Sequence, residues 1–168
     1  MIVGLVMSNA HGATLLQALA ILLRQAGHPP RLIYGGRLGP AWRPAGARHI
    51  GWHARPACGR AAILAGACRH AVRSLDGIVI TTARYHLEQA MLVAGRTAGV
   101  PCVIYHSALF LEARLNTPGA APRLEYYDVG DAGCVQGAFL RDQLVAAGVR
   151  PARVRVLGSP MLAALRAG

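Results

Sequence analysis

A chain of 168 residues fits a single domain that is long enough to bury a hydrophobic core. Hydrophobic residues make up 54% of it, which excludes a disordered chain, and no apolar run is long enough to cross a bilayer. The formal net charge is +11, and no acidic residue precedes Asp76, whereas half of the arginines do. This asymmetry predicts an anionic partner for the first half, such as phospholipid headgroups, a phosphorylated acceptor or nucleic acid. Because the chain has no lysine, a compositional bias toward arginine is the alternative interpretation.

The beginning of the chain carries the leading candidate for a functional centre. The apolar run at residues 2–7 predicts a central strand buried on both faces, and a helix is expected at 14–26. The short loop between them offers backbone N–H groups and a helix dipole to an anionic ligand. In that loop only His11 can act as a base near neutral pH. A structural histidine that caps the helix is the alternative.

Strands and helices alternate along the rest of the chain. We expect strands at 32–34, 48–51, 78–81, 102–105, 132–136 and 154–157, and helices at 60–75, 85–98 and 139–147. In the helix at 60–75, seven apolar residues are expected to face inward, namely Ala61, Ile63, Leu64, Cys68, Ala71, Val72 and Leu75. The alternation predicts an α/β fold over residues 1–168, a Rossmann-like three-layer αβα sandwich with a mainly parallel sheet of about six or seven strands.

Two irregular segments, 35–59 and 108–130, interrupt this pattern. The first holds Trp42 and Trp52 among arginines, which suits a membrane interface, a flap over a ligand or a cover for the sheet edge.

The residues that follow the strands are the candidate substrate site, because the carboxyl ends of parallel strands meet at one edge of a sheet. Besides His11, they are Ser8, Asn9, Gly12, Thr82, Arg84, His106, Ser107, Gln136, Gly158 and Ser159. Arg84 is a candidate phosphate ligand and His106 a candidate substrate contact. A solvated arginine and a packed histidine are the alternatives.

The sequence lacks the motifs of several other classes of functional site. No G-x-G-x-x-G follows the first strand, no P-loop lysine exists, and no G-x-S-x-G elbow is present. The four cysteines, Cys58, Cys68, Cys102 and Cys134, form no C-x-x-C pair, so reduced and buried thiols are expected rather than zinc ligands or disulfides. We therefore expect neither a metal nor a cofactor. A cytoplasmic location is expected because no basic segment precedes the first apolar stretch.

Five segments, in order, resemble the amino-terminal domain of a GT-B glycosyltransferase. They are VMSNAHG (6–12), LLRQAGH (22–28), DGIVI (76–80) followed by AGVPCV (98–103), DAGCVQG (131–137) followed by LVAAGV (144–149), and RVRVLGSP (153–160). The superfamily includes glycerophosphotransferase-like and UDP-GlcNAc 2-epimerase-like proteins. The resemblance implies that this domain holds the acceptor and that His11 is the catalytic base. It also implies that the nucleotide-sugar donor is held by a carboxyl-terminal domain or partner subunit outside these 168 residues, so the isolated chain is expected to be inactive.

The function implied is half of a glycosyltransferase or glycerophosphotransferase-like enzyme that transfers a sugar to a surface polysaccharide or lipid acceptor. The basic first half is then expected to contact a lipid-linked acceptor or the inner face of the cell membrane. Two alternatives stay open: a non-catalytic basic module for anionic membrane or nucleic acid, and half of a sugar-nucleotide epimerase. Nucleic acid is the less favoured partner, because the arginines are dispersed and no recognised motif is present.

Overall fold

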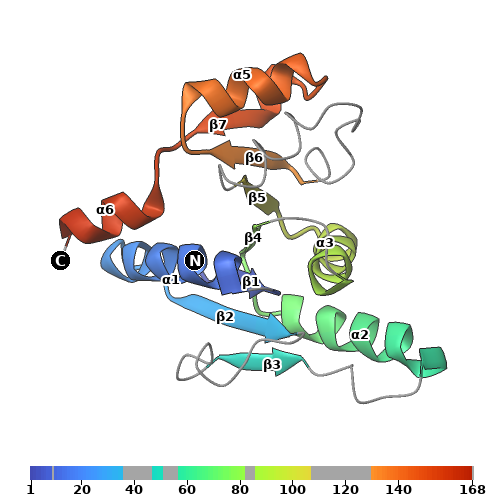
Figure 1. Ribbon diagram of the computed structural model, residues 1–168. Helices are drawn as coiled ribbons and strands as arrows, with labels where there is room; N and C mark the ends of the chain where they lie inside the picture. Colours follow the sequence, from blue (N-terminus) through green and yellow to red (C-terminus); the bar gives the residue numbers. More distant parts are fainter. Residues whose placement is uncertain (9, 36–46, 51–56, 82–85, 107–129, 168) are drawn as a thin grey trace.

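A computed structural model of the chain describes residues 1–8, 10–35, 47–50, 57–81, 86–106 and 130–167. Seven parallel strands form one sheet in the order β3-β2-β1-β4-β5-β6-β7 (Figure 1). The strands are β1 (Val3–Met7), β2 (Pro30–Gly35), β3 (Arg48–Ile50), β4 (Gly77–Ile80), β5 (Cys102–His106), β6 (Ala132–Val135) and β7 (Val154–Val156). The helices are α1 (Ala10–Gln25), α2 (Ala57–Val72), α3 (His86–Ala98), α5 (Ala138–Ala146), α6 (Pro160–Ala167) and the 3-10 helix η3 (Pro151–Arg153). The predicted α/β fold is confirmed.

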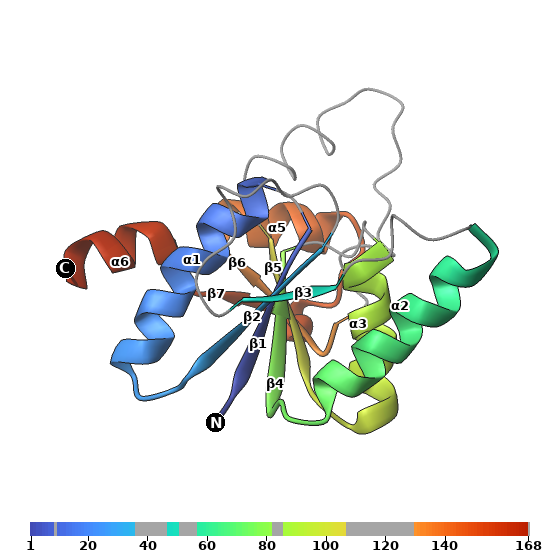
Figure 2. The same ribbon diagram turned by 90° about the horizontal axis from the view of Figure 1, so that it is seen from below.

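Helices cover both faces of this sheet. On one face, Leu16 and Ala20 of α1 pack with Leu5 of β1, and α6 lies against the outer side of α1. On the other face, Leu64 of α2 and Met91 of α3 belong to the core beneath those two helices. Figure 2 shows α1 and α6 on one side of the strands and α2 and α3 on the other. The molecule is therefore the expected three-layer sandwich.

The first strand is buried along its whole length, as its apolar sequence predicts. The helix that follows begins at Ala10, four residues before the expected start at Thr14. Gly12 and Ala13 are buried in its first turn, so two small side chains let this turn pack closely on the sheet. The loop after β1 is reduced to residues 8 and 9, and His11 belongs to the helix.

The expectation that Ala61 and Ile63 face inward is wrong. Both residues of α2 are exposed, and Ile63 keeps 40% of its surface. The other five residues of that expectation are buried, namely Leu64, Cys68, Ala71, Val72 and Leu75. Residues 61, 63 and 64 are spread around the helix at 100° per residue, so an alanine-rich pattern does not fix which side turns inward.

Aspartates hold the amino-terminal edge of the sheet. The carboxylate of Asp76, just before β4, accepts a hydrogen bond from the Ile2 amide at 2.6 Å. Asp131, just before β6, accepts one from the Cys102 amide at the same distance. Each carboxylate ties the start of its own strand to the start of the neighbouring strand. These two acids therefore stabilise the edge opposite to the candidate site.

Close packing between α3 and β4 depends on a glycine. A Cβ at Gly95 would lie 2.8 Å from Ile78 Cδ1 and 3.2 Å from the carbonyl oxygen of Val100. Gly66, inside α2, has no neighbouring atom within 4 Å of the same position. Gly95 is thus required by the approach of the helix to the sheet, and Gly66 is not.

The side chains of three cysteines are described, and Cys68, Cys102 and Cys134 are all buried free thiols. Burial raises the pKa of Cys68 to about 11 and that of Cys102 to about 12, and it also raises the pKa of Cys134. No helix in the described ranges is long and apolar enough to cross a membrane.

Candidate functional site

The candidate site lies where the direction of the chain through the sheet reverses. From β1 the chain moves to β2 and then β3 on one side, whereas from β4 it moves to β5, β6 and β7 on the other. In open α/β sheets, ligands bind outside the carboxyl ends of the strands at this switch point. β1 and β4 are paired up to Val6 and Ile80, so Ser8 and Thr81 follow the two strands at the same edge.

Two buried hydroxyl groups stand at this edge. Thr81 is only 4% exposed, and the hydroxyl oxygens of both Ser8 and Thr81 are buried. Within the described part of the chain, neither oxygen has a hydrogen-bond partner. A buried hydroxyl without a partner costs about 1–3 kcal/mol, so its presence in a folded protein needs an explanation, of which a ligand is one. The pair marks the β1–β4 edge as the place where a polar ligand group fits.

The first turn of α1 adds a positive potential to the same edge. Only residues 8 and 9 separate β1 from this helix, so the positive end of its dipole lies beside the switch point. His11 and Gly12 belong to this turn, and Gly12 is buried. The side chain of His11 lies outside the described part, as do Asn9, Thr82, Arg84 and Ser107 in full. The roles expected of these residues stay predictions.

A tyrosine brings two of the expected site residues together further along the edge. The Tyr105 hydroxyl, at the end of β5, donates a hydrogen bond to the Gly158 carbonyl oxygen at 2.6 Å. Gln136, which follows β6, forms a side-chain hydrogen bond with the same hydroxyl. Burial, reinforced by the nearby Cys134 thiol, raises the pKa of Tyr105 to about 12, so the phenol is neutral. This group links the ends of β5, β6 and β7.

His106 is packed on a neighbouring strand, and Ser159 caps a helix. His106 is 2% exposed, and its Nε2 would lie 3.2 Å from a Cβ at Gly133, so the ring rests on the backbone of β6. The Ser159 hydroxyl accepts a hydrogen bond of 3.5 Å from the Leu162 amide and caps α6, with Pro160 as the first residue of that helix. Substrate contacts by these two residues remain predictions.

Sequence reasoning missed Thr81 and Tyr105 as site residues. Both were counted as ordinary positions inside apolar strands. The available signal was that each is a polar side chain at the carboxyl end of a strand that is otherwise apolar.

The described residues offer hydrogen bonds and a helix amino end, but no cluster of metal ligands. No group of three or more His, Cys, Asp or Glu side chains among them could hold a metal ion. The hydroxyls of Ser8 and Thr81 can both donate and accept, which suits a hydroxylated ligand. The first turn of α1 suits an anionic group beside it.

No protein-family model matches this sequence, and no curated protein matches it. Several solved structures share its fold. The UDP-GlcNAc 2-epimerase from Methanocaldococcus jannaschii superposes with a TM-score of 0.74 at 10% identity, covering 98% of this chain and 47% of that one. The Neisseria meningitidis epimerase bound to UDP-GlcNAc gives 0.70 at 10% identity, covering 99% and 49%. The lipopolysaccharide outer core galactosyltransferase WaaB, in its apo form, gives 0.59 at 11% identity, covering 94% and 45%.

These likenesses establish the fold. The chain spans about half the length of the structures that it matches. It has the GT-B-like fold that the sequence resemblance predicts, in the form of one Rossmann-like half.

Proposed function

We propose that this chain is the acceptor-binding half of a glycosyltransferase or glycerophosphotransferase-like enzyme. The enzyme transfers a sugar from a nucleotide-sugar donor to a surface polysaccharide or to an anionic or lipid-linked acceptor. The observation that supports this most directly is the pair of buried hydroxyls, Ser8 and Thr81, at the β1–β4 switch point beside the first turn of α1. Such groups match the hydroxyls of a sugar or glycerol acceptor, which donate and accept hydrogen bonds in turn.

In this proposal His11 is the general base. Its neutral imidazole takes the proton of the acceptor hydroxyl while the hydroxyl oxygen attacks the anomeric carbon of the donor. The bond between that carbon and the phosphate oxygen breaks, and the nucleoside diphosphate leaves with the electron pair. The position of His11 in the first turn of α1 puts its backbone at the edge that holds Ser8 and Thr81.

The donor is proposed to bind a second domain or a partner subunit. An apolar surface near the end of the described chain supports this part of the proposal. It consists of exposed side chains at the end of β7 and on α6, namely Val156, Leu157, Met161, Leu162 and Leu165. Clusters of exposed apolar side chains typically mark an interface with another protein element. The isolated chain is therefore expected to lack transfer activity.

Half of a sugar-nucleotide epimerase is the second candidate, because UDP-GlcNAc 2-epimerases are among the solved structures of this fold. The two functions differ in what the reaction consumes. Transfer needs an acceptor and releases a nucleoside diphosphate, whereas epimerisation converts the nucleotide sugar alone.

One assay separates the two candidates in the enzyme that contains both halves. UDP-GlcNAc or UDP-galactose is incubated with and without a cell-envelope lipid and polysaccharide extract, and both free UDP and the sugar configuration are followed by NMR. Release of UDP that requires the extract supports transfer. Formation of the C2 epimer of UDP-GlcNAc without the extract overturns transfer in favour of epimerisation.

A further inference from the structure

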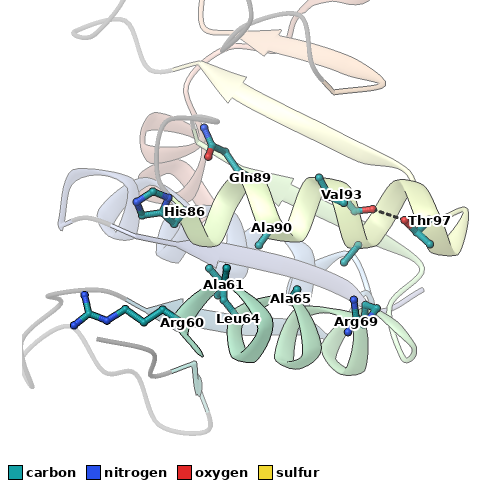
Figure 3. A pocket seen from close by; sticks show the side chains of 11 residues that line it. Arg60, Ala61, Leu64, Ala65, Arg69, His86, Gln89, Ala90, Val93 and Thr97 are labelled. Carbon is teal, nitrogen blue, oxygen red and sulfur yellow. Dashed lines mark hydrogen bonds between the residues drawn. The ribbon is translucent and has the colours of Figure 1, made fainter. Parts of the chain in front are cut away.

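A groove runs between α2 and α3, on the face of the sheet opposite to α1. Its volume is about 640 Å³, within the range of small-molecule sites (Figure 3). Alanines and two larger aliphatic side chains form much of its surface. The lining residues are Arg60, Ala61, Leu64, Ala65, Arg69, His86, Gln89, Ala90, Val93, Ala94 and Thr97. The groove is thus apolar along its length and polar at its ends.

The charge around this groove has one sign. The two helices carry Arg60, Arg69 and Arg96, and their only acidic residue, Glu88, is completely buried. Among the described residues that line the groove, none is acidic. Figure 3 shows Arg60 and His86 at one end and Arg69 toward the other. The groove therefore favours a molecule that combines an apolar body with an anionic group.

The dimensions of the groove suit an acyl chain. The nine steps of about 1.5 Å from Arg60 to Arg69 span about 14 Å along α2. A volume of about 640 Å³ over that length corresponds to a cross-section of roughly 45 Å². An extended hydrocarbon chain fits within a groove of this cross-section.

The two ends of the groove lie at different edges of the sheet. α3 starts after the carboxyl end of β4, and α2 ends before the amino end of the same strand. The end with Arg60 and His86 consequently lies toward the carboxyl edge, where Ser8 and Thr81 stand. Two side chains from two helices offer donors to an anion there, compared with the single arginine at the other end.

We propose that the α2–α3 groove binds an anionic membrane lipid, with its acyl chain along the apolar floor and its phosphate at Arg60 and His86. Exposed Val93 in the wall of the groove then faces the apolar layer from which the chain enters. The inference concerns binding alone, so it holds or fails independently of the transfer reaction.

The first experiment maps the binding of dodecyl phosphate, below its micelle concentration, by NMR of the backbone amides. Saturable shifts confined to residues 57–72 and 86–98 are expected. Inorganic phosphate lacks the hydrocarbon chain and dodecyl maltoside lacks the anionic group, so each is expected to bind at least tenfold more weakly. Equal binding of dodecyl maltoside, or shifts centred elsewhere, would overturn the proposal.

Matched variants test the floor and the charges separately. Val93→Asp puts a carboxylate into the groove, and Phe139→Asp on α5 is its control, since both side chains are 64% exposed. Val93→Asp should weaken dodecyl phosphate binding at least tenfold, and Phe139→Asp should leave it unchanged. The double variant that combines Arg60→Gln and His86→Gln should weaken dodecyl phosphate binding about tenfold, which is more than Arg69→Gln weakens it. A larger loss of binding in Arg69→Gln would overturn the proposed orientation of the lipid.

Vesicles distinguish a lipid in the groove from a merely basic surface. Sedimentation with phosphatidylglycerol vesicles should exceed that with phosphatidylcholine vesicles, and Val93→Asp should reduce it. If Val93→Asp binds phosphatidylglycerol vesicles as well as Phe139→Asp does, charge alone explains the binding and the groove has no part in it.

Discussion

Replacing Thr81 with valine tests whether the hydroxyl at the β1–β4 edge is kept for a ligand. Valine has the same shape as threonine, so Thr81→Val removes a buried hydroxyl that has no partner among the described residues and leaves the packing intact. An unmet buried hydroxyl costs about 1–3 kcal/mol. We therefore expect the free energy of unfolding to rise by about 1 kcal/mol, and the Tm by about 2–4 °C for a chain of this size.

Urea denaturation measures this change, and Thr97→Val is the matched control. The Thr97 hydroxyl is exposed and donates a hydrogen bond of 2.9 Å to the Val93 carbonyl oxygen, so its loss should lower the free energy of unfolding by about 0.5 kcal/mol. In the proposed transferase, Thr81→Val should raise the KM for the acceptor about fivefold, because one hydrogen bond is lost. A Thr81→Val variant that is less stable than the wild type would refute the reasoning, since its hydroxyl would then be bonded within the protein.

Three further changes follow from the packing and the buried groups. Gly66→Ala should raise the free energy of unfolding by about 0.5–1 kcal/mol, whereas Gly95→Ala should lower it by about 1–3 kcal/mol. If urea denaturation shows a change of the same sign for both variants, the packing of α3 on β4 is contradicted. Tyr105→Phe should cost about 1–2 kcal/mol in the same assay, because the Gly158 carbonyl loses its donor; no change would show that water replaces the hydroxyl. The pKa of Cys102 is about 12 in the folded chain and ordinary when unfolded, so its contribution is present below about pH 8.5 and is lost as the pH rises toward 12. Urea denaturation at pH 8 and pH 10.5 should show a loss that is smaller in Cys102→Ala by about 1–2 kcal/mol, because the buried thiols of Cys68 and Cys134 still contribute in that variant. An equal loss in Cys102→Ala would exclude the Cys102 thiol as a cause.

The order of the elements could be predicted from the sequence because a buried strand is recognisable as a short run of apolar residues. The apolar run of β1 and the turn residues between the later strands locate the seven strands of a parallel sheet. The start of α1 was misplaced because Gly12 has a low helix propensity. The structure shows Gly12 and Ala13 buried against the sheet, so tertiary packing overrides that propensity.

From the sequence, the candidate site could be located only at the edge formed by the carboxyl ends of the strands. Periodicity identifies the residues that follow the strands, and it correctly brings Gln136 and Gly158 to one place. It does not reveal which polar side chains find partners. Thr81 stands without one among the described residues, whereas the Ser159 hydroxyl is used by a helix cap. Such differences depend on contacts between distant segments, which no local pattern records.

The central claim is that the corner between β1 and α1 is the acceptor side of a transferase, with His11 as its base. The most direct test is the turnover number of His11→Ala in the enzyme that contains both halves, measured as acceptor-dependent release of UDP at saturating donor. A general base contributes about 10²–10⁴ in rate, so the account predicts a fall in kcat of that size in a variant that remains folded. A kcat equal to that of the wild type would contradict the assignment of His11 and of the corner around it.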